Sequence, residues 1–261
     1  MVFHGSGNPA IVSRASGLPL SHYIQTKRTS TWSLDRIVGI VLQATRALAA
    51  IHAKNTIHKN LAPANILVDD SDWTARLMNF DIAAALSREH QNKGASRRME
   101  GTLAYISPEQ TGRVAHDVDY RSDIYSLGAV FFELLFGRRP FNAKTHREWA
   151  HAHVGQKPQI PADGGARVPE TLTKIVLRML EKSPENRYQT AFGLMHDLKR
   201  ALDDLNQKGH ITPFALGEKD LSEIFRVPKA LYGRAPELAK LEGLFDEVVQ
   251  DDTRVCFIAG H

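Results

Sequence analysis

The sequence predicts a mainly helical fold with a small β component, of the α+β class. Residues 33–52 carry apolar side chains at the i, i+3, i+4, i+7 spacing of a helix buried along one stripe, and the same spacing recurs later in the chain, at 127–135, 171–181 and 191–205. Residues 66–68 and 75–78 are short apolar runs joined by a polar turn, which indicates a β-hairpin. A chain of 261 residues with 43% hydrophobic content can bury a sizeable core.

The composition narrows the classes of function. Lys and Arg exceed Asp and Glu by 33 − 29 = 4, and these charges are spread along the chain, so we expect no nucleic-acid partner. Cys256 is the one cysteine, which excludes an internal disulfide and a Cys-rich zinc cluster and favours a reducing compartment. Neither a signal peptide nor an apolar run of about 18 residues is present, so we expect a soluble, cytoplasmic protein without a membrane partner.

Two neighbouring motifs carry the chemistry. The first is Ile-His-Lys-Asn-Leu-Ala-Pro-Ala-Asn-Ile-Leu-Val at 57–68, and the second is Leu-Met-Asn-Phe-Asp-Ile-Ala at 77–83. The first resembles the catalytic loop of protein kinases, His-Arg-Asp-Leu-x-x-x-x-Asn, and the second resembles the Asp-Phe-Gly segment that opens their activation segment.

Three further motifs, at 101–109, 122–128 and 184–188, follow in the order found in kinases. Residues 101–109, Gly-Thr-Leu-Ala-Tyr-Ile-Ser-Pro-Glu, resemble the end of the activation segment, with serine in place of alanine. The resemblance implies that Asp123 hydrogen-bonds the catalytic-loop backbone and that Arg187 pairs with Glu109 as a buried structural pair. It therefore implies a protein-kinase-like C-terminal lobe over residues 20–205.

The departures from the kinase pattern fall on the reacting positions. Asn60 stands at the catalytic aspartate and cannot accept a proton near neutral pH, and loss of a general base costs roughly 10²- to 10⁴-fold in rate. Ala62 stands at the loop lysine and supplies no cation to the transferred phosphate. Asn79 replaces the main magnesium-binding aspartate with a neutral amide, a poor ligand for Mg²⁺.

Other positions keep the family residue or offer a substitute. Asn65 matches the magnesium-binding asparagine and is a weak Mg²⁺ candidate. Asp81 falls on the glycine position, and we expect its side chain to point away from the metal. His58 and Phe80 match members of an internal hydrophobic stack in the family, so we interpret them as structural.

The two ends of the chain predict further segments. Residues 1–19 contain neither a Val-Ala-Ile-Lys-like strand nor a convincing Gly-rich loop, so we interpret them as a hinge and N-lobe remnant in a chain lacking most of the N-lobe. Residues 206–231 are expected to be a linker. Residues 232–261 resemble the truncated α/β start of a P-loop ATPase domain, as in large bacterial multi-sensor signalling proteins, but contain no Gly-Lys-Ser/Thr.

Three functions remain open at this point. The first is a pseudokinase that acts as a regulatory or docking module in bacterial signal transduction, with other signalling proteins or domains of a larger parent protein as partners. The second is an active serine/threonine kinase with non-standard metal ligands, Asn65 and Asp81, which would need ATP and Mg²⁺. The third is a truncated gene fragment with no role of its own. For this chain we expect no cofactor and no phosphotransfer; substrate, input signal and oligomeric state are not readable from the sequence.

Overall fold

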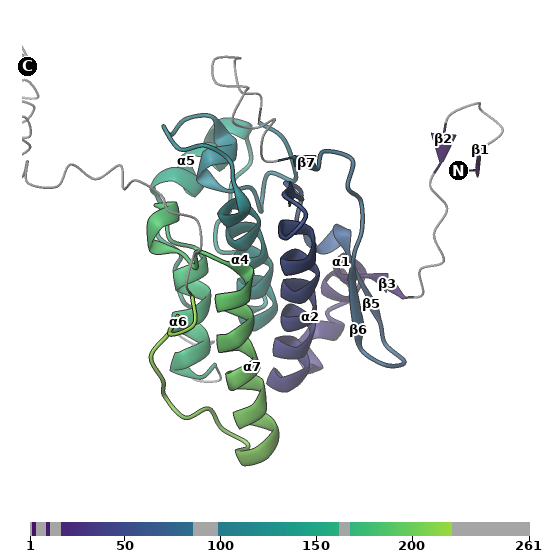
Figure 1. Cartoon of the computed structure of the whole chain (residues 1–261), viewed down its shortest axis with the longest axis vertical. Helices are drawn as coiled ribbons and strands as arrows, with labels where there is room; N and C mark the ends of the chain where they lie inside the picture. Colours follow the sequence, from purple (N-terminus) through teal and green to yellow (C-terminus); the bar gives the residue numbers. More distant parts are fainter. Residues whose placement is uncertain (1, 4–8, 11–16, 86–98, 162–167, 221–261) are drawn as a thin grey trace, which may run out of the picture. The chain divides into compact units, whose positions relative to one another are not determined.

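The computed structural model describes residues 2–3, 9–10, 17–85, 99–161 and 168–220. Helices dominate this part of the chain (Figure 1). The α-helices are α1 (Leu20–Gln25), α2 (Leu34–His52), α4 (Tyr120–Phe136), α5 (His146–Gly155), α6 (Glu170–Met179) and α7 (Ala191–Lys208). Single 3-10 turns are η1 (Arg28–Thr31), η2 (Pro63–Asn65), η3 (Pro108–Thr111) and η4 (Pro184–Asn186).

Helix α4 forms the centre of the core. Asp119 caps its first turn, since its side chain accepts a hydrogen bond from the backbone N–H of Arg121, and Gly137 ends it in the left-handed conformation at φ 67°. Most of its residues are buried, which an amphipathic surface helix would not show. Helix α4 packs against α2 on one side and α6 on the other, and α2 also packs along α7 (Figure 1).

The predicted hairpin is present as part of a three-stranded antiparallel sheet. Strand β5 (Ile66–Asp69) pairs with β6 (Thr74–Leu77) and, on its other edge, with β3 (Leu18–Pro19), which leads directly into α1. Asp69 closes the turn by accepting a hydrogen bond from the backbone N–H of Ser71. A separate pair joins β4 (Thr56–Ile57) to β7 (Ala84–Ala85), so the start of the first motif and the residues directly after the second run side by side.

The N-terminal expectation needs correction. Strands β1 (Val2–Phe3) and β2 (Pro9–Ala10) form an antiparallel pair, so an N-lobe-like sheet is present and not lacking. The sequence reasoning missed this pair because strands of two residues are too short to show a period-two pattern.

The segment expected to be a linker begins differently. Helix α7 continues to Lys208, and the chain then returns along the helices instead of leaving them. Asp220 accepts hydrogen bonds from the backbone N–H groups of Gln189 and Thr190, and Arg178 donates to the carbonyl of Leu216. The rest of that segment and the expected ATPase start at 232–261 lie outside the described residues.

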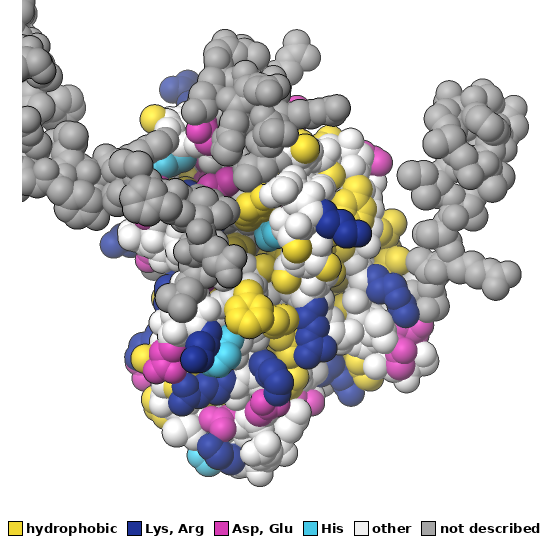
Figure 2. Space-filling model, in the orientation of Figure 1, with side chains coloured by type: hydrophobic (Ala, Val, Ile, Leu, Met, Phe, Trp, Pro, Cys, Tyr) yellow, Lys and Arg dark blue, Asp and Glu magenta, His cyan; other side chains and the backbone are white. Residues whose placement is uncertain are grey.

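Charge on the face shown in Figure 2 is mixed rather than segregated. On the face in Figure 2, Lys and Arg alternate with Asp and Glu over the described helices. None of the helices in the described part of the chain is long and apolar enough to cross a membrane.

Candidate active site

Asp123, on the first turn of α4, fixes the loop that carries the first motif. Its two carboxylate oxygens accept hydrogen bonds from the backbone N–H groups of His58 at 2.9 Å and Lys59 at 2.8 Å. The ring nitrogen Nε2 of His52 lies 2.9 Å from the same carboxylate. Because Asp123 is fully buried, these bonds satisfy a charge that would otherwise be costly, and they tie the loop to the most buried helix.

Two hydrogen bonds fix the orientation of the His58 ring. Its Nδ1 accepts from the backbone N–H of Asn60 at 3.3 Å, which leaves Nε2 to donate to the carbonyl of Met78 at 3.1 Å. The bond to Met78 connects the two motifs. The ring of Phe80 packs on His58 with centroids 4.6 Å apart.

Phe80 is more exposed to solvent than a member of an internal hydrophobic stack would be. His58 is fully buried, but Phe80 is 44% exposed and Met78 is 37% exposed. The expectation that both members of the pair are internal therefore fails for Phe80. The described residues cover the face of Phe80 that meets His58 and leave much of the rest accessible.

The side chain of Asn60 is hydrogen-bonded by Thr102, in the motif at 101–109. Its Oδ1 accepts from both the backbone N–H and the hydroxyl of Thr102, each at 3.0 Å. An amide oxygen with two donors is an acceptor for hydrogen bonds but not a base for a hydroxyl proton near neutral pH. The backbone carbonyl of Asn60 accepts from Asn65 Nδ2 at 2.7 Å, so Asn65 is oriented by the same loop.

Asn65, Asn79 and Asp81 converge. The backbone of Asn79 is left-handed at φ 65°, a conformation that asparagine tolerates, and its Nδ2 lies 3.2 Å from Asn65 Oδ1. With the Asn79 amide turned over, its nitrogen instead donates to the Asp81 carboxylate, at 2.5 and 3.3 Å from the two oxygens. We favour this orientation because a hydrogen bond to a carboxylate is stronger than one to an amide oxygen. Asp81 thus points toward Asn79, contrary to the expectation that it points away.

The family pattern places a basic side chain at two positions of this loop, and the present chain keeps one, Lys59, and has Ala62 at the other. Ala62 is 1% exposed and belongs to the hydrophobic core, so no cation reaches the site from there. Lys59 adopts φ 67°, and its Nζ forms an ion pair with Glu100 at 2.8 Å. The side chain of Lys59 is 10% exposed, so its charge is mostly shielded from solvent and engaged by an acid just before Gly101.

Glu109 and Arg187 form a buried bidentate pair. Arg187 Nη1 and Nη2 donate to the two carboxylate oxygens of Glu109 at 2.7 and 2.9 Å, and both side chains are at most 1% exposed. The three remaining N–H groups of the guanidinium donate to backbone carbonyls, those of Glu181, Arg121 and Lys182. All five donors of Arg187 therefore have acceptors, which is what a buried guanidinium requires.

Several contacts of the site were not foreseen from the sequence. The sequence assigned Thr102 no contact with the first motif, whereas it binds Asn60; His52 and Glu100 were not singled out at all. A weak signal existed for Thr102, because it directly follows the glycine of its motif. For His52 and Glu100 there was none, since their partners are 71 and 41 residues away in sequence.

The residues present fit a magnesium-nucleotide poorly. Their oxygen donors are two neutral amides and one carboxylate, and that carboxylate is occupied by the Asn79 amide in the favoured orientation. Mg²⁺ prefers anionic oxygens and near-octahedral geometry. No group of three or more His, Cys, Asp and Glu residues able to hold a metal occurs among the described residues.

The packed helices, the loop anchored by Asp123 and the Glu109–Arg187 pair define a kinase-type helical lobe. A sequence model of the protein kinase domain matches residues 10–198, and the chain belongs to this family. Members of the family typically bind ATP with Mg²⁺.

Curated relatives agree with the assignment. The chain is 38% identical over 165 residues to serine/threonine-protein kinase PknB of Mycolicibacterium smegmatis, covering 63% of this chain and 26% of that protein. It is 33% identical over 190 residues to PknB of Mycobacterium tuberculosis, covering 73% and 30%. It is also 28% identical over 322 residues to hybrid signal transduction histidine kinase G of Dictyostelium discoideum, covering 90% and 9%. The chain thus spans less than a third of the length of each of these relatives.

Proposed function

We propose that this serine/threonine-kinase-like domain is a pseudokinase, a regulatory or docking module in signal transduction whose phosphotransfer is impaired. The main support for the proposal is the identity and the hydrogen bonding of the Asn60 side chain. A neutral amide stands at the position of the family's catalytic carboxylate, and Thr102 occupies its oxygen with two hydrogen bonds. Its partners would be other signalling proteins or domains of a larger parent protein.

Further support comes from what the domain keeps. Asp123 and the Glu109–Arg187 pair, which shape the loop and the end of the segment, retain their bonds in full. The positions that would contact the phosphates, Ala62 and Asn79, have lost their charge. Retention of the scaffold with loss of the charged groups is expected of a domain selected for binding rather than for transfer.

A second candidate is an active kinase with substitute metal ligands. The orientation of Asp81 favours it, since the carboxylate lies beside Asn79 and Asn79 lies beside Asn65. If Mg²⁺ bound here, Asn65, Asn79 and Asp81 would be the side chains that hold it, and it would supply positive charge to the phosphates of ATP.

Nucleotide binding separates the two candidates. Thermal melting of the full chain is measured with and without MgATP, and with the Asp81→Ala variant in parallel. A ligand at 100 times its Kd stabilises the folded state by about 2.7 kcal/mol, which raises the Tm by several degrees. The pseudokinase proposal predicts no such rise; a rise that Asp81→Ala removes would establish the second candidate.

The same melting curves address the possibility of a gene fragment without a role. The residues from 17 to 220 that the structure describes share one buried core, so we expect a single cooperative transition. A broad, non-cooperative transition would favour the fragment.

A further inference from the structure

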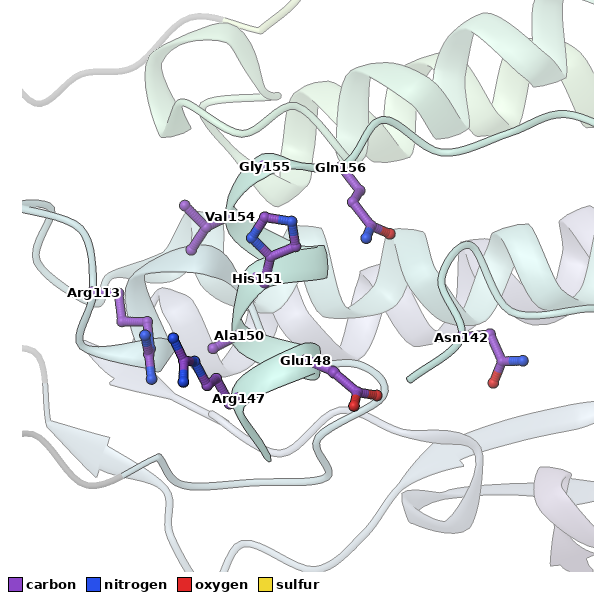
Figure 3. Close-up of a pocket in the computed structure, with 9 residues that line it drawn as sticks. All are labelled: Arg113, Asn142, Arg147, Glu148, Ala150, His151, Val154, Gly155 and Gln156. Atoms are coloured by element: carbon purple, nitrogen blue, oxygen red, sulfur yellow. The ribbon is translucent and has the colours of Figure 1, made fainter. Parts of the chain in front are cut away.

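A hollow of about 690 Å³ lies beside α5, next to the end of the motif at 101–109. Figure 3 shows that its lining comes from α5, from the loops on either side of that helix and from Arg113, which follows η3. The guanidinium ends of Arg113 and Arg147 are drawn toward each other in this view, with His151 one helical turn further along α5.

The cations of this pocket have no anion of their own. In the part of the chain that the structure describes, neither Arg113 nor Arg147 has a hydrogen-bonding or ion-pairing acceptor for its side chain. The one carboxylate in the lining, Glu148, is engaged elsewhere: its Oε2 accepts from the backbone N–H of Lys144 at 2.8 Å, and this bond lowers the pKa of its carboxyl. Glu148 therefore stays ionised, and its carboxylate binds the backbone just before α5.

The position of Arg147 adds an electrostatic argument. It is the second residue of α5, where the backbone N–H groups already carry partial positive charge, so a cation there destabilises the helix. A second guanidinium, that of Arg113, lines the same pocket and adds positive charge to it. An anion in the pocket would relieve both and would meet planar, multidentate donors from two arginines.

Helix α5, which lines the pocket, also contacts the segment of the candidate active site through the buried His153, which is not among the lining residues. His153 Nε2 lies 2.9 Å from the carbonyl of Leu103, the neighbour of Thr102, which in turn binds Asn60. Helix α5 also packs on η3, at the end of the same segment. A polypeptide bound at the pocket would therefore lie next to the segment that contacts Asn60.

We propose that this pocket binds the phosphate of a phosphorylated serine or threonine in a partner polypeptide; the proposal rests on the docking role proposed above and names the chemistry of the partner. A phosphate monoester carries nearly two charges and three acceptor oxygens, which matches two guanidinium groups and an imidazole better than one carboxylate does. A nucleic acid fits less well, because its phosphates are evenly spaced along a chain and the basic groups here gather in one hollow.

Fluorescence anisotropy with the full chain tests this. The probe is a labelled nine-residue peptide with a central phosphoserine among glycine and alanine, compared with the same peptide carrying serine and with inorganic phosphate as a competitor. We expect the phosphopeptide to bind at least roughly tenfold more tightly than the serine peptide, and Arg113→Gln/Arg147→Gln to remove that difference. Exposed arginines are replaced without loss of core, so the double variant should melt like the parent.

The control is Arg46→Gln, which removes one positive charge from the exposed face of α2, as each of the single variants Arg113→Gln and Arg147→Gln does from the pocket; Arg46 does not line the pocket. Equal affinity for the phosphorylated and unphosphorylated peptides would overturn the proposal, as would an equal loss in Arg46→Gln. Displacement of the probe by a single-stranded oligonucleotide at lower concentration than by phosphopeptide would overturn it in favour of nucleic acid. Since no ATP is added, binding can fail while the pseudokinase assignment stands, and the reverse also holds.

Discussion

Arg187 has every N–H group paired inside the protein, at a site that water does not reach. Removing Glu109 would leave that guanidinium charged and buried without its carboxylate. Removing Arg187 would leave the carboxylate with one side-chain donor, the hydroxyl of Ser122 at 2.6 Å. Either loss is expected to cost far more than the pair contributes on balance, because the remaining charge stays desolvated.

We therefore predict that Glu109→Ala and Arg187→Ala each lower the free energy of unfolding by about 3–5 kcal/mol, measured by urea denaturation. The control is Lys174→Ala, which breaks an exposed ion pair with Glu170 and should change stability by less than about 0.5 kcal/mol. A loss below about 1 kcal/mol in either buried variant would show that the site relaxes and admits water.

At the residue scale, the sequence motifs identified the buried polar residues that hold the loop and the segment in place. They did not predict how exposed the neighbouring side chains are or where they point. Asp123, Glu109 and Arg187 could be assigned because each stands at a fixed place in a motif, and the structure brings the last two together. The exposure of Phe80 and the direction of Asp81 could not be predicted, since both depend on which surfaces the rest of the chain covers. The two arginines of the basic pocket were not singled out, because they come from segments that meet only in the fold.

At the scale of elements, the contact of α4 with α6 depends on one glycine. A Cβ added at Gly128 would lie 2.7 Å from the Cβ of Met179, whereas a Cβ at Gly39 on α2 meets nothing within 4 Å. Both glycines are inside helices, so the intrinsic gain in helix propensity is the same and only the space differs.

Gly39→Ala should thus raise the free energy of unfolding by about 0.5–1 kcal/mol. Gly128→Ala should lower it by about 1–3 kcal/mol, because α4 and α6 must move apart. Thermal unfolding of the two variants side by side is the measurement. Stabilisation by both would mean that the α4–α6 contact adjusts freely.

Helix α5 is joined to the segment before η3 by a neutral histidine. His153 donates to the Leu103 carbonyl through Nε2, and its Nδ1 accepts from the Tyr125 hydroxyl at 3.1 Å. Burial lowers the pKa of His153 to about 4, and the nearby Lys182 ammonium acts in the same direction. The unfolded chain, with an ordinary pKa near 6.5, binds the proton first as the pH falls.

Stability from His153 is therefore complete above about pH 6.5 and declines as the pH falls toward 4, by at most about 1.4 kcal/mol per pH unit. Urea denaturation between pH 7 and 4 should show a shallower decline in His153→Gln than in the parent chain. His210→Gln, at an exposed position, should follow the parent. Identical slopes for the parent and His153→Gln would contradict a neutral, buried imidazole.

Element positions were largely predictable because each long helix has a strong period. The helix expected at 33–52 is α2, Leu34–His52, and the one expected at 191–205 is α7, which extends to Lys208. That extension was missed because Asn206 and Gln207 are polar and do not continue the apolar period of the helix. The return of residues 211–220 along α7 depends on Asp220 binding two backbone N–H groups.

At the scale of the whole molecule, the chain is a protein kinase domain that keeps the helical core and the polar framework of its family. Its departures gather where phosphate and hydroxyl would react: Asn60, Ala62, Asn79 and Asp81. The basic pocket beside α5 lies outside that group and depends on none of those residues. The proposed docking and the proposed loss of phosphotransfer can therefore be tested separately.

Phosphotransfer itself is the most direct test. The full chain is incubated with radiolabelled MgATP and a general serine/threonine substrate such as myelin basic protein, beside the Asn60→Ala variant and an active PknB as positive control. Our account predicts background incorporation for the chain and no further decrease in Asn60→Ala. Incorporation well above background that Asn60→Ala abolishes would show that this site transfers phosphate with an asparagine, and the pseudokinase proposal would be wrong.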